Sequence, residues 1–226
     1  DVYKRQISIG GEFRSVNNGQ FEGIVRFSTN PPGGAKDGPR LSDAAWKPTA
    51  GTSPVPGSAR VSIPTNWDRD DLTLTYELRR DGATEPVATA TADGTWWKQT
   101  TVTLDDPTAT PGATQSYTVV AKDRDGNIAT SASVNAKATA GTASAYSKKI
   151  LADKPSLYYP MGNVSKDWAG SNNPVSGTGA SASSSGIENS GTGSTTFNGT
   201  TNGRVSSDAK APVSSEFSAE IWFQTL

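Results

Sequence analysis

Short alternating apolar runs are the feature of this sequence that most restricts its fold. Within each run an apolar side chain stands at every second position, and Gly, Pro, Asn or Asp follows soon after. This period of two is typical of β-strands with one buried face. A helical pattern is confined to one short stretch, Ala145 to Leu151. The sequence therefore predicts an all-β chain.

Residues 58–139 contain the clearest module of this kind. Strands at this spacing predict a β-sandwich of about 80–100 residues. The expected strands are Ala59 to Ile63, Leu72 to Leu78, Val87 to Thr91, Trp97 to Leu104, Tyr117 to Ala121 and Ile128 to Ala136.

Three motifs follow one another in this module: Leu104, Pro111-Gly112 and the run Tyr117 to Ala121. In this order they resemble the region around the tyrosine-corner strand of fibronectin type III domains. The resemblance implies a two-sheet sandwich whose last hairpin turns at Asp123 to Asn127. It also implies a Trp in an early strand near Ile63, where this sequence has none. An Ig-like or cadherin-like sandwich is the alternative.

The residues before the module divide into three parts. Residues 1–6 read as translated sequencing adapter and are excluded from the fold. Residues 7–29 predict a hairpin, because the Asn-Gly pair in Asn17-Asn18-Gly19 suits a turn with positive φ. This hairpin resembles a blade remnant of secreted actinobacterial β-propellers, which implies a propeller upstream. The Pro- and Gly-rich residues 30–57 predict a semi-rigid connector, with Trp46 pinning part of it to a neighbour.

After a linker at residues 140–146, the region 147–226 has a different sequence pattern. Its motifs, in order, are Leu157 to Gly162, Asp167-Trp168, Thr196 to Gly199, Arg204-Val205 and Phe217 to Thr225. They resemble the start of a laminin-G-like (concanavalin A-like) jelly roll. The resemblance implies a truncated domain whose remaining strands lie beyond Leu226, and a calcium ion in the complete domain. No other cofactor is expected.

Composition excludes several kinds of chemistry. The chain has no His and no Cys, so it cannot build a Ser-His-Asp triad, a thiol nucleophile or an imidazole or thiolate metal site. The net charge of -1 argues against nucleic-acid binding. No window approaches the roughly 18 apolar residues of a membrane span, so no membrane insertion is expected. These observations predict a non-catalytic region.

Acidic residues in turns are the first candidates for a site. Asp123 and Asp125 have the Asp-x-Asp-Gly rhythm of calcium loops. Because residues 128–136 contain no further acid, a hairpin turn is the favoured interpretation. The acids at 68, 70 and 71 and at 105 and 106 are expected to be solvated turn residues.

Tryptophans are the second candidates. If a strand includes Trp96 and Trp97, one enters the core and the other faces outward, where it contacts a sugar or a neighbouring domain. Core plus domain contact is the favoured outcome for this pair. In the run Phe217 to Phe223, Trp222 shares the polar face and is a candidate for glycan contact, although missing strands would cover it equally well.

These observations lead to one functional hypothesis and two alternatives. The chain is expected to be a fragment of a secreted or cell-surface bacterial protein, with a spacer sandwich and a carbohydrate- or ligand-binding laminin-G-like module. Its expected partners are a polysaccharide or cell-surface glycan and neighbouring domains of the same chain. The alternatives are an accessory region of a secreted sugar-acting oxidoreductase or glycoside hydrolase with a catalytic propeller, and a structural adhesin or stalk.

Overall fold

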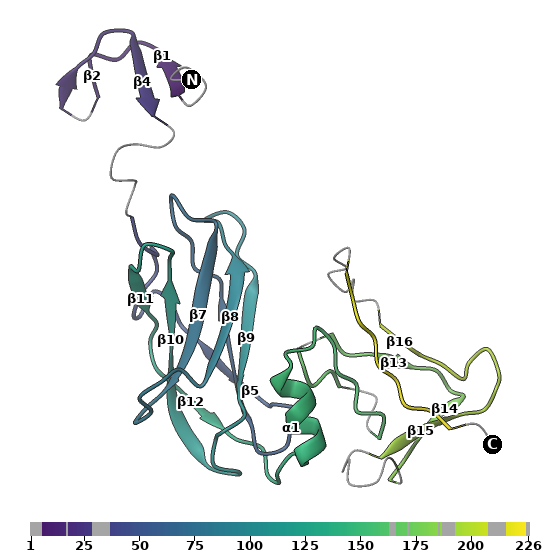
Figure 1. Ribbon diagram of the computed structural model, residues 1–226. Helices are drawn as coiled ribbons and strands as arrows, with labels where there is room; N and C mark the ends of the chain where they lie inside the picture. The colour runs from purple at the N-terminus through teal and green to yellow at the C-terminus, as the bar shows by residue number, and fades with distance from the viewer. Residues whose placement is uncertain are drawn as a thin grey trace.

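The computed structural model describes residues 6–16, 18–28, 37–162, 166–170, 172–184, 186, 193–207 and 216–224. Its elements form a small N-terminal unit, a central sandwich of two sheets, and a C-terminal set of short strands with one helix (Figure 1). The described chain is therefore mostly β, and its one helix lies where the helical pattern occurs.

The N-terminal unit is a hairpin within a hairpin. Strands β1 (Gln6–Gly10) and β4 (Ile24–Ser28) pair antiparallel, and β2 (Ser15–Val16) pairs with β3 (Gly19–Gln20) between them. Asn18 has a φ of 64°, as the Asn-Gly turn predicts. Of the stretch interpreted as adapter, residues 1–5 lie outside the described residues and Gln6 opens β1.

The central sandwich has one sheet in the order β5-β6-β9 and a second in the order β11-β10-β7-β8. Strand β12 pairs with the other half of β10. All pairings are antiparallel. The strands are β5 (Thr49–Gly51), β6 (Ala59–Pro64), β7 (Thr73–Arg80), β8 (Ala88–Asp93), β9 (Thr101–Asp106), β10 (Thr114–Lys122), β11 (Ile128–Thr130) and β12 (Val134–Lys137).

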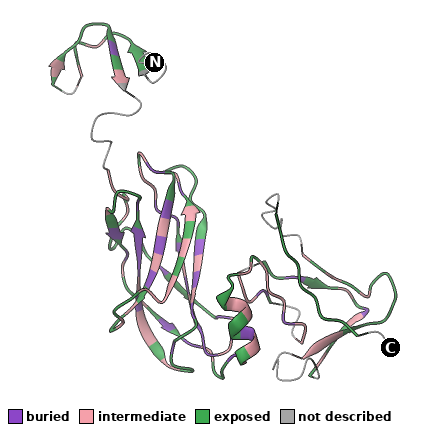
Figure 2. Ribbon diagram, in the orientation of Figure 1, coloured by how far each residue is buried: buried purple, intermediate pink, exposed green. Residues whose placement is uncertain are grey.

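Alternation within the strands builds the core between the two sheets. Buried positions recur at every second residue in β6 and β7, because successive side chains of a strand point to opposite faces (Figure 2). The most deeply buried apolar side chains are Trp46, Ala59, Val61, Ile63, Leu74, Tyr76, Leu78, Tyr117, Val119, Ala121 and Ala136.

Strand order and a buried tyrosine define a fibronectin type III-like sandwich over this part of the chain, as the motifs predict. Tyr117 is 1% exposed, and its hydroxyl donates a hydrogen bond to Asp106 Oδ2 at 3.0 Å. Arg80 Nη1 reaches the same oxygen at 2.7 Å, and the amide of Thr108 donates to Asp106 Oδ1. The expectation that Asp106 is a solvated turn residue is wrong, because it is a fully buried acceptor at the end of β9. Asp105 also lies in β9, where it pairs with Arg60 at 2.6 Å.

Trp46 lies within residues 30–57, which the Pro- and Gly-rich composition predicts to be a connector, but its side chain packs in the core of the sandwich. Its side chain is 1% exposed, its ring centroid lies 6.2 Å from that of Tyr76, and its Nε1 donates to the Pro64 carbonyl at 2.8 Å. Strand β5 then pairs with β6. The sandwich therefore begins upstream of residue 58, and Trp46 supplies the aromatic side chain that β6 lacks.

The C-terminal region opens with helix α1 (Ala145–Ala152), where the helical pattern predicts it, capped by the Ser144 side chain. Asp167 is fully buried and accepts hydrogen bonds from the amides of Tyr158 and Ala169, so it joins two of the motifs expected here. Among the described residues, four short strands follow in two separate antiparallel pairs. They are β13 (Val175–Ser176), β14 (Ala180–Ser183), β15 (Ser194–Phe197) and β16 (Val205–Ser206).

The expected strand over Phe217 to Thr225 is not present within residues 216–224. The side chains of Phe217, Ile221, Trp222 and Phe223 are all exposed. A strand needs a partner, and no neighbouring strand pairs with these described residues. In the part of the chain that is described, no helix has the length and apolar character to span a membrane.

Candidate functional site

Three loops meet at one end of the sandwich, which we call the apical end. They are residues 65–72 between β6 and β7, residues 94–100 between β8 and β9, and residues 123–127 between β10 and β11. The strand register places them together, because Thr73 pairs with Asp93 and Lys122 pairs with Thr75.

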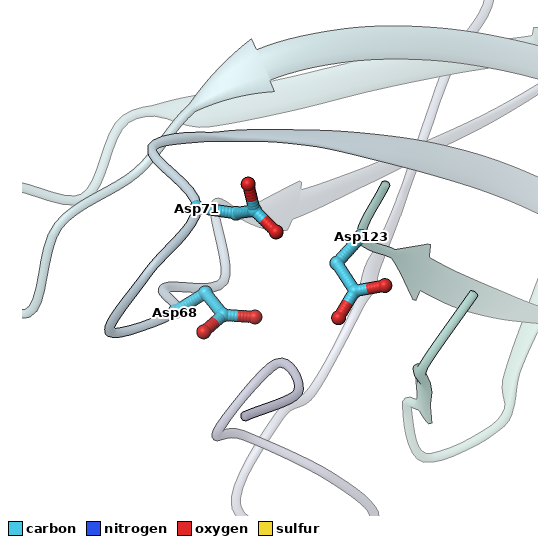
Figure 3. Close-up of side chains that lie close together, drawn as sticks. All are labelled: Asp68, Asp71 and Asp123. Carbon is cyan, nitrogen blue, oxygen red and sulfur yellow. The ribbon is translucent and has the colours of Figure 1, made fainter. Parts of the chain in front are cut away.

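Five aspartates from two of these loops form a cluster at the apical end. Asp68, Asp71 and Asp123 each offer a carboxylate oxygen within 4.8 Å of the others, and Asp70, Asp71 and Asp125 do the same. Figure 3 shows the carboxylates of Asp68, Asp71 and Asp123 facing a common space. Asp71 belongs to both triads and therefore occupies the centre of the aspartate cluster.

Several oxygens of the aspartate cluster are buried without a donor. Asp71 is 9% exposed and Asp123 is 5% exposed. Among the described residues, no hydrogen-bond partner reaches Oδ2 of Asp68, either carboxylate oxygen of Asp70, or Oδ2 of Asp71. Leaving a buried acceptor without a partner costs about 1–3 kcal/mol, and more when it is charged. Within the described chain, these four oxygens therefore lack a hydrogen-bond donor, whereas Asp71 Oδ1 and both oxygens of Asp123 have one.

Two arginines flank the aspartate cluster without neutralising it. Arg124 Nε lies 3.1 Å from Asp71 Oδ1, but its side chain is 70% exposed. Arg69 pairs instead with Asp37 at 3.4 Å. Exposed ion pairs of this kind contribute only about 0–1 kcal/mol. The interior of the cluster keeps its excess of negative charge.

The carboxyl pKa values reflect this excess. Burial raises the pKa of Asp68 from 3.8 to about 6, and the neighbouring Asp70 carboxyl adds to the rise. Burial also raises the pKa of Asp71, against the lowering effect of Arg124 and with a further rise from the surrounding aspartates. A bound cation would oppose both rises in pKa, because its positive charge favours the ionised carboxylates.

The chemistry of the donors favours a hard divalent cation. Carboxylate oxygens are the ligands that calcium and magnesium prefer, and calcium takes 6–8 oxygens at about 2.3–2.6 Å in irregular geometry. The chain has no His or Cys to favour a softer metal. Five carboxylates on two loops can provide several of these oxygens, and water would complete the shell.

The structure confirms one prediction about these acids and corrects another. Residues 123–127 form the predicted turn, with the Asp123 amide donating to the Asn127 carbonyl at 3.1 Å. The expectation that the acids at 68, 70 and 71 are solvated is wrong, because the loop folds them toward Asp123 and away from water. The calcium candidates Asp123 and Asp125 thus gain three further carboxylates from a loop about fifty residues earlier.

Trp96 and Trp97 lie on the third apical loop. Neither enters the core: the two are 68% and 69% exposed, so the prediction of one buried ring is wrong. The reason is that β9 begins only at Thr101, while residues 95–98 form a turn closed by the Thr95–Lys98 bridge. The two rings stand edge to face, with centroids 5.4 Å apart.

The remaining candidate, Trp222, lies far along the chain from the apical end. It is 66% exposed, and its Nε1 donates to Glu220 Oε1 at 2.6 Å. The structure therefore brings together the acid candidates at one site and leaves Trp222 outside it.

Comparison with known proteins adds a similarity to a solved structure. No family model matches the chain, and no curated protein matches it. Among solved structures, the chain is similar to the FN5 domain of Drosophila Lar, with 20% identity over 45% of this chain and 100% of that domain and a TM-score of 0.26.

Proposed function

We propose that residues 37–139 form a calcium-binding spacer sandwich within a secreted or surface-anchored multidomain protein, and that this region is non-catalytic. One observation carries the proposal: the aspartate cluster holds four buried carboxylate oxygens that have no donor among the described residues. A chain that only needed a turn at 65–72 would leave such carboxylates in water. A bound cation best explains their inward placement, because it would coordinate the oxygens that have no hydrogen-bond donor among the described residues.

Calcium is favoured over magnesium by the shape of the cluster. Magnesium requires nearly ideal octahedral geometry and keeps most of its waters, whereas calcium accepts many protein oxygens in irregular positions. Two overlapping triads that share Asp71 supply an irregular, oxygen-rich set of this kind. The two triads also allow a second ion beside the first.

Isothermal titration calorimetry of the full chain, stripped of metal with a chelator, tests this proposal. We expect saturable calcium binding, weaker magnesium binding, and at least a tenfold loss of calcium affinity in Asp71→Asn. Asp81→Asn is the matched control, because Asp81 is an exposed turn residue at the other end of the sandwich. Equal affinities of Asp71→Asn and the unaltered chain would refute the site.

A second candidate function is glycan contact at the apical Trp pair. Trp96 and Trp97 are both largely exposed, and an exposed aromatic ring can stack on a sugar ring. Affinity electrophoresis through gels containing different polysaccharides tests this function. We expect retardation of the full chain that Trp96→Ala abolishes. Unchanged mobility in every gel would contradict it.

The motifs of the C-terminal region support a second part of the proposal. We propose that it begins a laminin-G-like module that binds carbohydrate, and that the N-terminal hairpin is the remnant of a propeller blade. An accessory role beside a sugar-acting enzyme, or a role as a stalk, would use the same spacer. Trp222→Ala separates the alternatives, since loss of glycan binding favours the binding module and no change favours the stalk.

A further inference from the structure

The residues that lead into the sandwich are held by the same loop that carries three of the clustered aspartates. We call residues 37–41 the approach segment. The Arg40 amide donates to the Trp67 carbonyl at 3.0 Å. The Leu41 amide donates to Asn66 Oδ1 at 2.9 Å, and Asn66 Nδ2 returns a hydrogen bond to the Leu41 carbonyl at 2.8 Å. The loop 65–72 therefore fixes the backbone of the approach segment directly.

The second loop of the aspartate cluster holds the other end of the approach segment. Asn127 Nδ2 donates to the Asp37 carbonyl at 3.3 Å and to Asp123 Oδ2 at 2.7 Å. The Asn127 amide donates to Asp123 Oδ1 at 2.8 Å. The approach segment passes so close that a Cβ on Gly38 would lie 2.9 Å from Asn127 Cβ. Asp123 thus faces the cluster and also orients the side chain that contacts the approach segment.

Charged contacts connect the approach segment to the same place. Asp37 pairs with Arg69, which stands between two clustered aspartates in sequence, and Arg40 lies 5.9 Å from the centroid of the Trp67 ring. These contacts are at least partly exposed and weak individually. These contacts form only while loops 65–72 and 123–127 stay close to each other. Repulsion among the five carboxylates of the aspartate cluster pushes the two loops apart.

We infer that cation binding at the aspartate cluster clamps the approach segment, so that the site is a cation-dependent junction between the sandwich and the residues that enter it. The inference rests on the proposed cation site. A cation that draws Asp68, Asp71 and Asp123 together fixes both loops at once, and the two loops hold residues 37–41 from two sides. By reciprocity, a firmly seated approach segment strengthens cation binding.

Amide hydrogen exchange, measured by NMR on the full chain with and without calcium, tests the clamp. Exchange at Arg40 and Leu41 should slow at least tenfold in saturating calcium. The Asp81 amide, which donates to the Ser116 carbonyl at the other end of the sandwich, should not change. Calcium binding by calorimetry with unchanged exchange at Arg40 and Leu41 would overturn the clamp and leave the site intact. Absence of calcium binding would overturn both.

A substitution outside the aspartate cluster tests the reciprocal effect. Gly38→Ala should push the approach segment off Asn127, speed exchange at Arg40 and Leu41, and weaken calcium binding about tenfold. Gly51→Ala is the matched control, because its new Cβ would meet the Arg60 side chain at ordinary distances, 3.5 Å from Cγ and 3.7 Å from Cδ. If Gly38→Ala speeds exchange but binds calcium with unaltered affinity, the two events are independent and the inference is wrong.

Discussion

Replacing Trp46 by Ala should remove a large part of the stability of the sandwich. The side chain is 1% exposed and packs on Tyr76, and its Nε1 donates to the Pro64 carbonyl. Truncating a buried aromatic residue to Ala costs about 3–5 kcal/mol, and loss of the partly buried hydrogen bond to the Pro64 carbonyl adds about 1 kcal/mol. The expected loss of about 4–6 kcal/mol is comparable with the whole free energy of unfolding of a domain, about 5–15 kcal/mol.

Urea denaturation of the full chain, followed by far-ultraviolet circular dichroism, measures this loss without relying on Trp fluorescence. Trp46→Phe keeps a ring beside Tyr76 and should lose less, about 1.5–3 kcal/mol. Trp97→Ala is the control and should change the free energy of unfolding by no more than about 0.5 kcal/mol, because Trp97 is exposed. A Trp46→Ala chain within about 1 kcal/mol of the unaltered protein would refute the claim that residues 41–57 belong to the sandwich.

Three further predictions follow from buried charges. In chelator, Asp71→Asn should raise the thermal unfolding midpoint, since it removes a poorly solvated charge. In calcium it should lower the midpoint, because it loses the stabilisation by bound calcium, which is about 2.7 kcal/mol at 100 times Kd. Equal losses in both buffers would contradict the cation site. Because the pKa of Asp68 is raised to about 6 in the fold, its contribution to stability is present below about pH 4 and is lost as pH rises through 6. The midpoint in chelator should therefore rise when pH falls from 7.5 to 5. Asp68→Asn should reduce that rise and leave the part that Asp71 contributes. A rise of unaltered size in the variant would assign it to other groups. Asp106→Ala should lower the free energy of unfolding in urea by about 3–5 kcal/mol, because it leaves buried partners unpaired. Tyr117→Phe should lower it by only about 1 kcal/mol. Similar losses in the two variants would contradict the central role of Asp106.

Alternation made the sandwich strands predictable. Val61 and Ile63 in β6, and Leu74, Tyr76 and Leu78 in β7, are buried as a period of two requires. The pattern works here because one face of each strand packs on the core and the other meets solvent. It says nothing about which residues outside the strands complete the core, so the role of Trp46 within a Pro- and Gly-rich segment had no periodic signal.

The aspartate cluster was only partly predictable. Each loop shows its acids in the sequence, and the Asp-x-Asp-Gly rhythm marks Asp123 and Asp125. Their meeting with Asp68 and Asp71 depends on the antiparallel pairing of β7 with β10, a contact between distant parts of the chain. Burial of a carboxylate is likewise a tertiary property, and for this reason the expectation of solvated turns failed.

Local turn chemistry explains the error at Trp96 and Trp97. The sequence from Trp97 to Leu104 satisfies a strand pattern, but the Thr95 side chain accepts a hydrogen bond from the Lys98 amide at 3.2 Å and closes a turn. Side chains of Ser and Thr offer the backbone this alternative to a ladder. A Thr three residues before Lys98 was the available signal.

A crystal structure of the full chain grown with calcium would test the central claim most directly. An anomalous difference peak is predicted between Asp68, Asp71 and Asp123, with carboxylate oxygens of Asp71 and at least one neighbour about 2.3–2.6 Å from it. A map without a peak there, in crystals that contain calcium and keep the cluster as described, would contradict the account.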